Sequence, residues 1–450
     1  MRKTVGLLLA VPLLVACEKA PQTVTWKPCG EGAQCGSVSV PVDWDQPDGA
    51  RMPVAVVRRM APQGKSLGTL VYLPGGPGGS GVETIAGSPE FGGLEKVFDI
   101  VSLDPRGVGK SSPLTCPTDA VKAVMPTSLP RTDAELDAVR RKNLALAQEC
   151  RKASGPAFDH LDSASAARDL EAVRQALGVK EINLYAHSYG TLLAQEYAAR
   201  FGGTLRSAVL DGTMDHSATA RTFASTAGRA LDEAFGEFVR WCGKDRACSL
   251  HGKDPAAAFA RMGADYGVRA EIDGMLFTPA WPIVADYLKT LSHGKKWTAE
   301  PAEDERPGKT VNYADPIVCQ DFDLRYSSAA ALRADLGAGY SPNAAKAILS
   351  CQGWPSPVAN PQRPARSVAD HPMLLVQSRY DNATPLAWSR AVAGQLGDRG
   401  SLVVLPDWTH AMKLFNEGCQ ADLVKSYLIA PGPRTAPTTC TTTPPGVKNP

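Results

Sequence analysis

A short apolar run, a tight turn and a helix-like segment follow one another in the middle of the chain. Residues 182–184 are apolar, residues 185–190 read YAHSYG, and residues 191–200 have the composition of a helix. The residues two places before and after Ser188 are small, as close packing of a strand against a helix requires. Such a turn holds the serine hydroxyl at a helix N-terminus, where the helix dipole favours negative charge. The pattern is typical of a nucleophile elbow, with Ala186 in place of the usual glycine.

Strand-like and helix-like segments alternate over much of the chain. Apolar runs predict strands at residues 68–73, 98–103, 182–184, 207–210, 372–377 and 401–405, after an early hairpin of residues 38–42 and 54–59. Helical spacing is found at residues 163–177, 386–396 and 421–428. This alternation predicts an α/β fold with a mostly parallel, doubly wound sheet that is covered on both faces.

Residues 213–367 interrupt the alternation and predict a helical cap inserted between late strands. Helix-like segments within it include residues 220–241 and 256–266. The core then consists of residues 38–212 and 368–450. Because 44% of the 450 residues are hydrophobic, the chain can bury a sizeable core.

The N-terminus resembles an export signal of the lipoprotein type. Residues 1–3 are positively charged at two positions, residues 5–16 are apolar, and Cys17 follows small residues. We therefore expect residues 1–16 to be removed and Cys17 to be lipidated, with residues 17–37 forming a tether and an N-terminal disulfide region. A plain secretory peptide with an incidental cysteine is the alternative. The expected location is the cell envelope, periplasmic or anchored to the outer membrane, or outside the cell, with membrane contact only through the lipid.

Ten further cysteines fall into five neighbouring pairs along the chain. An even number of cysteines in an exported protein indicates disulfides. Sequential pairing predicts Cys29–Cys35, Cys116–Cys150, Cys242–Cys248, Cys319–Cys351 and Cys419–Cys440. A zinc site is less favoured, because no Cys-x2-Cys pair is accompanied by a second one.

The charge balance excludes an obvious nucleic-acid partner. The chain has 48 basic and 46 acidic residues, a net charge of +2, and no basic run. No cluster of metal ligands and no dinucleotide-binding signature is present, so we predict catalysis without a metal or other cofactor.

A serine nucleophile needs a histidine base that a carboxylate orients. Asp381 follows the strand at 372–377, and His410 follows the strand at 401–405, in the order serine, acid, histidine. Asp211 also ends a strand and is a rival acid. Position disfavours the other histidines: His160, His187, His216, His251, His293 and His371.

An oxyanion hole needs two backbone N–H groups near the nucleophile. Tyr189, directly after Ser188, is expected to supply one of them. The glycine-rich residues 74–81 follow the strand at 68–73, and Gly76 is expected to supply the other. A phosphate cradle is a weak alternative, because no Gly-Lys-Ser/Thr follows.

Taken together, these motifs resemble the prolyl-aminopeptidase family of α/β-hydrolases, and most of all its secreted tripeptidyl aminopeptidases. The resemblance covers nearly all of the mature chain. It is carried by GGPGG, DPRGVGKS, the serine elbow, the Asp381 and His410 segments, VPVDW after Cys35, CQD at 319–321 and CQGWP at 351–355. Ala186 and the Thr409-His410-Ala411 segment depart from the glycines that are frequent in the family.

The resemblance implies an exported serine aminopeptidase that removes short N-terminal fragments, such as tripeptides, from peptides with a free N-terminus. It suggests that Asp321 binds the substrate ammonium, with a solvated or capping carboxylate as an equal alternative. It also suggests that Trp354 lines a proline-accepting pocket, but a buried packing role is favoured for this residue. A carboxylic ester hydrolase on the same fold is the alternative function, and a non-catalytic binding protein is a third.

Overall fold

The computed structural model describes residues 22–88, 90–262, 265–278, 281–293, 309–415, 418–432 and 440. Within these ranges, a nine-stranded sheet has the order β1-β2-β3-β5-β4-β7-β8-β10-β11. Its strands are β1 Lys27–Gly30, β2 Ala33–Pro41, β3 Arg51–Arg59, β4 Thr69–Leu73, β5 Asp99–Leu103, β7 Ile182–His187, β8 Leu205–Asp211, β10 Met373–Ser378 and β11 Gly400–Leu405. From β5 to β11 all neighbours are parallel, and β1, β2 and β3 form the antiparallel edge.

Helices cover both faces of the sheet. Successive side chains of strand β4 are buried on opposite faces of the sheet, so both faces need cover. Val71 and Leu73 belong to one buried cluster, and Leu70 and Tyr72 belong to the other. The first cluster includes helices α4 Ser163–Leu177, α5 Gly190–Phe201 and α13 Leu386–Leu396; the second includes α1 Gly81–Gly87 and α14 Cys419–Ile429. The predicted α/β fold with a mostly parallel, covered sheet is confirmed.

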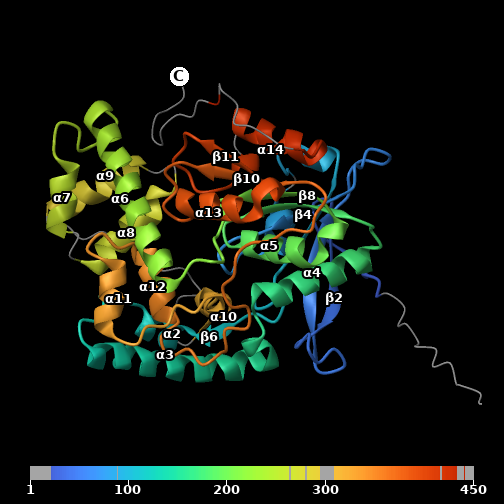
Figure 1. The fold of residues 1–450 in the computed structure, drawn as a ribbon, viewed down its shortest axis with the longest axis horizontal. Helices are drawn as coiled ribbons and strands as arrows, with labels where there is room; N and C mark the ends of the chain where they lie inside the picture. Colours follow the sequence, from blue (N-terminus) through green and yellow to red (C-terminus); the bar gives the residue numbers. More distant parts are fainter. Residues whose placement is uncertain are drawn as a thin grey trace, which may run out of the picture.

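A helical region follows β8, and part of it has a core of its own. Its helices are α6 Ala220–Lys244, α7 Pro255–Met262, α8 Tyr266–Leu276, α9 Trp281–Ser292, α10 Val318–Asp321, α11 Ala329–Leu336 and α12 Pro342–Ser350. Phe238, Trp241 and Trp281 pack together in that core. Figure 1 shows these helices gathered beside the sheet, with α3 Asp133–Ser154 running along the molecule below them. We refer to residues 213–367 as the cap.

One local prediction differs from the structure. The helix-like segment 256–266 contains parts of two helices, because the side chain of Asp265 accepts a hydrogen bond from the backbone N–H of Val268 and starts α8 afresh. The short 3-10 helices, which the sequence did not indicate, are η1 Leu94–Lys96, η2 Gly155–Asp159, η3 Gly202–Thr204, η5 Asp315–Ile317, η6 Gly397–Arg399 and η7 Lys413–Phe415.

A second difference concerns the segment between β5 and α4, which the sequence analysis placed in the core. It forms β6 Thr115–Pro117, α2 Thr118–Val124 and α3. Strand β6 pairs with β9 Thr310–Asn312 of the cap. From α3, the buried Asn143 amide donates to the carbonyl oxygens of Leu349 (2.7 Å) and Gln352 (2.8 Å). This segment therefore supports the cap, a role that only tertiary contacts reveal.

Five disulfides link the pairs that sequential pairing predicts: Cys29–Cys35, Cys116–Cys150, Cys242–Cys248, Cys319–Cys351 and Cys419–Cys440. Several disulfides in one chain indicate an exported protein. In the described ranges, no helix has both the length and the apolar character that crossing a membrane requires.

A buried ion pair joins the loop after β5 to α4. The Arg106 guanidinium donates to both carboxylate oxygens of Asp169, at 2.7 and 2.6 Å, and both side chains are almost fully buried. Arg106 also donates to the carbonyl oxygens of Val42 (2.9 Å) and His160 (2.8 Å), and the Trp44 indole donates to Asp169 (2.9 Å). Because every charged atom has partners, burial of the pair is tolerated.

We expect Asp169→Asn to lower the free energy of unfolding by about 3–5 kcal/mol, because it leaves the Arg106 charge buried and unpaired. Urea denaturation of the purified protein measures this loss. The double variant Arg106→Met/Asp169→Leu should lose less than Asp169→Asn alone. A loss below about 1 kcal/mol for Asp169→Asn would contradict this account.

Candidate active site

Ser188 lies in a strained turn between β7 and α5. Its φ of 53° is in the left-handed region, which is unusual for a residue other than glycine. The turn is held by a hydrogen bond from the Ser188 N–H to the carbonyl oxygen of Asp211 (2.9 Å). Gly190 is required next to it, because a Cβ there would come within 2.5 Å of the Leu73 carbonyl oxygen. This is the geometry of the elbow that the sequence indicates.

Asp381 and His410 form a hydrogen-bonded pair in the loops after β10 and β11. The Nδ1 atom of His410 lies 2.8 Å from Oδ2 of Asp381, whose side chain is fully buried. Oδ1 of Asp381 accepts from the N–H groups of Ala383 (2.8 Å) and Thr384 (2.9 Å), and the Thr384 hydroxyl donates to Oδ2 (2.9 Å). Burial acts to raise the pKa of Asp381, but His410 and the hydrogen bonds from Thr384 outweigh it and hold that pKa below its usual value.

The hydrogen bond to Asp381 determines which ring nitrogen of His410 carries the proton. A carboxylate only accepts hydrogen bonds, so Nδ1 carries the proton that lies between His410 and Asp381. In the neutral ring, Nε2 is then an acceptor and is able to take a proton. Thr384, whose hydroxyl lies 3.2 Å from Nδ1, supports the same orientation and was missed in the sequence analysis.

Gly212 lies between His410 and the turn that carries Ser188, and its lack of a side chain lets the imidazole come close. A Cβ on Gly212 would lie 3.2 Å from Cε1 of His410, and the φ of +69° at this residue favours glycine. Gly212 directly follows Asp211, whose carbonyl oxygen accepts from the Ser188 N–H. Ser188 and His410 also line one cavity of about 690 Å³. The structure thus brings Ser188, Asp381 and His410 together.

Asp211, the rival acid, has other partners. Its Oδ2 accepts from the Tyr185 hydroxyl (2.7 Å) and from the Lys413 N–H (2.6 Å). The group is fully buried, and burial raises its pKa despite the nearby Lys413 charge. Since Nδ1 of His410 bonds to Asp381, the geometry favours Asp381 as the acid that orients the histidine.

Gly76 and Tyr189, the expected oxyanion-hole residues, both line the same cavity. The φ of +119° at Gly76 is a conformation that other residues rarely adopt. A hydrogen bond from the Gly79 N–H to the Gly75 carbonyl oxygen (3.0 Å) closes the loop around it. Within the described residues, neither the Gly76 nor the Tyr189 backbone N–H donates a hydrogen bond, so both remain available to an oxyanion.

The cavity lies between the loops at the carboxyl ends of the strands and the cap. Its wall is largely apolar and includes Met214, Phe223, Phe277, Val318, Ala344 and Trp388. The wall also carries the carboxylate of Asp315 and the ammonium of Lys346, which lie 2.7 Å apart. No local motif marks either residue in the sequence, so neither was expected at the site.

The expectation that Asp321 binds a substrate ammonium needs correction. Asp321 is fully buried and is not part of the cavity wall. Its carboxylate accepts from the backbone N–H and hydroxyl of Ser163 (2.9 and 2.8 Å), the Tyr189 hydroxyl (2.6 Å) and the Asn360 amide (2.7 Å). With these four donors its hydrogen-bonding capacity is taken up, and it instead fixes the side chain of Tyr189 from the cap.

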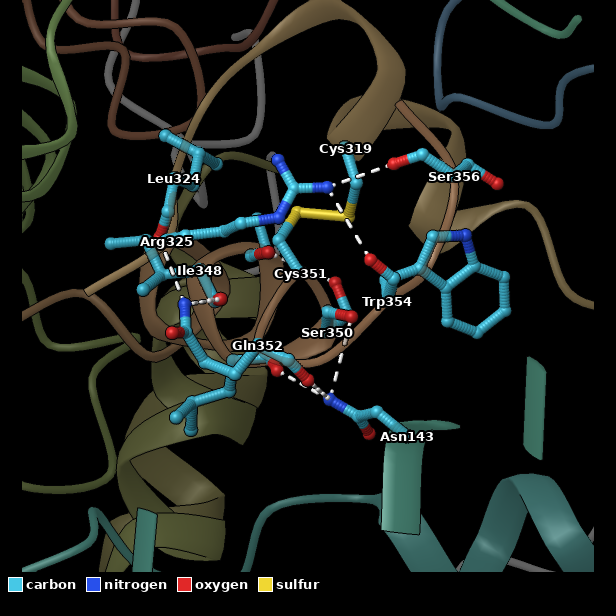
Figure 2. The surroundings of a disulfide bond; sticks show 12 residues. Asn143, Cys319, Leu324, Arg325, Ile348, Ser350, Cys351, Gln352, Trp354 and Ser356 are labelled. Atoms are coloured by element: carbon cyan, nitrogen blue, oxygen red, sulfur yellow. Dashed lines mark hydrogen bonds between the residues drawn. A yellow bond between two sulfur atoms is a disulfide. The ribbon is translucent and has the colours of Figure 1, made fainter. Parts of the chain in front are cut away.

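Trp354 does not line the cavity either. Figure 2 shows its indole beside the Cys319–Cys351 disulfide, and its carbonyl oxygen accepts from Arg325 (3.3 Å). The indole is buried and stacks on Phe158 at a centroid distance of 5.4 Å. The packing alternative therefore describes Trp354, and the proline-pocket expectation is corrected. Cys17 and the signal segment lie outside the described residues.

Residues 68–417 match a family model described as the alpha/beta hydrolase fold. The chain belongs to the α/β-hydrolase family. In this family the nucleophile stands at a strand–turn–helix elbow, which is where Ser188 lies.

Its relatives carry names from two activity classes. Serine protease Hip1 of Mycobacterium tuberculosis is 27% identical over 91% of this chain and 89% of its own. Carboxylesterase B of the same species is 30% identical over 91% of this chain and 88% of its own. Tripeptidyl aminopeptidase of Streptomyces coelicolor is 34% identical over 45% of this chain and 40% of its own. The chain is a serine hydrolase of the α/β-hydrolase fold.

His187, next to the nucleophile, is a half-buried neutral imidazole on the cavity wall. Its Nε2 accepts from the Gly75 N–H (3.3 Å), and its ring stacks on Tyr72 at a centroid distance of 5.5 Å. Burial, with a smaller effect of His410, lowers the pKa of His187 to about 4. It therefore helps to hold the Gly75 loop as a neutral acceptor.

We expect His187→Gln to flatten the acid dependence of stability. Unfolded His187 takes up a proton near pH 6.5 and the folded group only near pH 4, so acidification through this window favours the unfolded state. As the pH falls from about 6.5 to about 4, the free energy of unfolding of the wild type should decrease faster than that of His187→Gln. The two slopes should differ by about 1 kcal/mol per pH unit. Urea denaturation between pH 4 and 7.5 measures the difference. The exposed His371→Gln variant is the control, and an equal slope for His187→Gln and wild type would refute the assignment.

Proposed function

We propose that the protein is an exported serine aminopeptidase of the prolyl-aminopeptidase type, which releases short peptides such as tripeptides from free N-termini. The observation that carries this proposal is the 2.8 Å pair of His410 and Asp381 beside a cavity that Ser188 also lines. A serine, a histidine and a buried carboxylate in this arrangement are the parts needed for acyl transfer.

In this proposal, the Ser188 hydroxyl attacks the scissile carbonyl carbon while Nε2 of His410 takes the hydroxyl proton. Asp381 keeps the proton on Nδ1 and stabilises the imidazolium that forms. The tetrahedral oxyanion receives hydrogen bonds from the N–H groups of Gly76 and Tyr189. His410 then protonates the leaving amine, and a water molecule that His410 activates releases the acyl fragment from Ser188.

Peptide substrates are supported by two of the relatives. One is named a serine protease and is similar over 91% of this chain; the other is named a tripeptidyl aminopeptidase and is similar over 45%. The cavity of about 690 Å³ is within the size range of sites that take small ligands.

Ester hydrolysis is the second candidate. It is favoured by the largely apolar wall of the cavity and by a relative that is named carboxylesterase B. Amide and ester cleavage use the same triad, so substrate binding by the cap must distinguish them.

Ser188→Ala should abolish labelling by a fluorophosphonate probe and remove hydrolysis of a free-amine tripeptide p-nitroanilide. Asp381→Asn should lower kcat about 10³- to 10⁴-fold, because His410 loses the acceptor for its Nδ1 proton. Initial rates with the tripeptide amide, its N-acetylated form and p-nitrophenyl butyrate measure these effects. Asp211→Asn, which alters the rival acid, is the matched control and should cost far less kcat than Asp381→Asn.

Two results would reject parts of this proposal. Retention of activity and probe labelling in Ser188→Ala would reject the serine mechanism. Hydrolysis of the ester without any hydrolysis of free-amine peptides by the wild type would replace the peptidase by an esterase.

The N-terminal signal supports membrane anchoring of the exported protein through a lipid on Cys17. Cys17→Ser should move the protein from the membrane fraction to the soluble fraction of the envelope and abolish incorporation of labelled palmitate. Equal membrane association of the variant would contradict lipid anchoring.

A further inference from the structure

Asp315 and Lys346 are the charged pair on the wall of the catalytic cavity. In the part of the chain that the structure describes, they provide the only carboxylate and the only ammonium among its lining residues. Asp315 begins η5, and Lys346 belongs to α12. Their charged atoms lie 2.7 Å apart, and about a third of each side chain remains exposed (31% and 38%). The pair is therefore accessible to a ligand.

This pair stands where two cavities meet. A second cavity of about 510 Å³ adjoins the first, and Pro77, Asp315 and Lys346 line both. The η5 segment also touches the oxyanion loop, since a Cβ on Gly78 would lie 2.7 Å from Cβ of Ala314. The Asp315 carboxylate thus lies on the same side of the catalytic cavity as the loop that carries Gly76.

A ligand cation can replace Lys346 at little cost. Ion pairs whose members stay exposed contribute weakly to stability, because water screens both charges and the side chains lose freedom. The Lys346 side chain also borders the second cavity, which gives its ammonium another position when Asp315 takes a new partner. A substrate with a neutral acyl group has no cation that could replace the Lys346 ammonium at Asp315.

We propose that Asp315 binds the free α-ammonium of a peptide substrate by exchanging it for the Lys346 ammonium. The inference builds on the proposed peptidase function and names the residue pair that selects its substrates, peptides with a free N-terminus. Lys346 neutralises Asp315 in the empty site and competes with the substrate. The exchange favours charged N-termini over neutral acyl groups, which is the selection an aminopeptidase needs.

The two members of the pair should therefore act in opposite directions. The readout is the kcat/KM for a free-amine tripeptide p-nitroanilide divided by the kcat/KM for p-nitrophenyl butyrate. Asp315→Asn should lower this ratio about tenfold or more, because a charge-assisted hydrogen bond to the substrate is lost. Lys346→Met should raise it by up to about fivefold, because the competing cation is removed. The ratio cancels any change in the amount of folded enzyme.

A merely structural ion pair would behave differently, because breaking it from either side would have the same effect. Matched controls are Glu149→Gln and Lys152→Met, which break a 2.7 Å pair on α3 that borders neither cavity. These controls should leave the ratio within twofold of wild type. A ratio that changes in the same direction in Asp315→Asn and Lys346→Met, or stays within twofold in Asp315→Asn, would overturn the exchange.

The outcome separates this inference from the proposed function. If the wild type cleaves the ester but not the free-amine tripeptide, the aminopeptidase proposal fails and Asp315 has no such ligand. If the wild type cleaves the free-amine tripeptide and the Asp315→Asn ratio is unchanged, only the ammonium site is overturned.

Discussion

The buried carboxylate of Asp381 is the group on which the candidate site depends. A charge without access to water is stable only when donors surround it, and two backbone N–H groups, the Thr384 hydroxyl and His410 supply them. The same contacts orient the imidazole. Beyond them, Lys413, itself buried, donates to Asp407 (2.6 Å) and to the Thr409 hydroxyl (2.8 Å), which secures the loop that carries His410. Stability and alignment of the histidine thus come from one set of hydrogen bonds.

The cap does more than cover the cavity. Asp321 reaches from it to the Tyr189 hydroxyl, beside the nucleophile, and to Ser163 at the start of α4. Asp273 of α8 accepts from the Ser341 hydroxyl (2.6 Å) and from the Asn382 amide (2.8 Å), next to Asp381. Cap and core are therefore joined by buried hydrogen bonds at both ends of the catalytic arrangement.

Sequence reasoning succeeded where the signal is local. The sequence predicts the helices at 163–177 and 386–396 with the bounds they have, because apolar residues recur in them at helical spacing. It failed where the deciding partner is distant. The CQD motif identified Asp321 as a notable acid, but its burial depends on Asn360 and Ser163, which lie far away in the chain. Asp315 and Lys346 carry no motif at all, and α3 gave no sign that its Asn143 would bond to the cap.

By itself, the sequence determined the alternation of strands and helices, the turn around Ser188, and the order of serine, acid and histidine. These follow from side-chain periodicity and from the small residues of a tight turn, which act over a few positions. Tertiary structure alone decided that Asp381 and not Asp211 pairs with His410, since one acid follows β10 and the other ends the neighbouring strand β8. It also decided which charges border the cavity, because burial and hydrogen bonding are properties of the folded neighbourhood rather than of the residue.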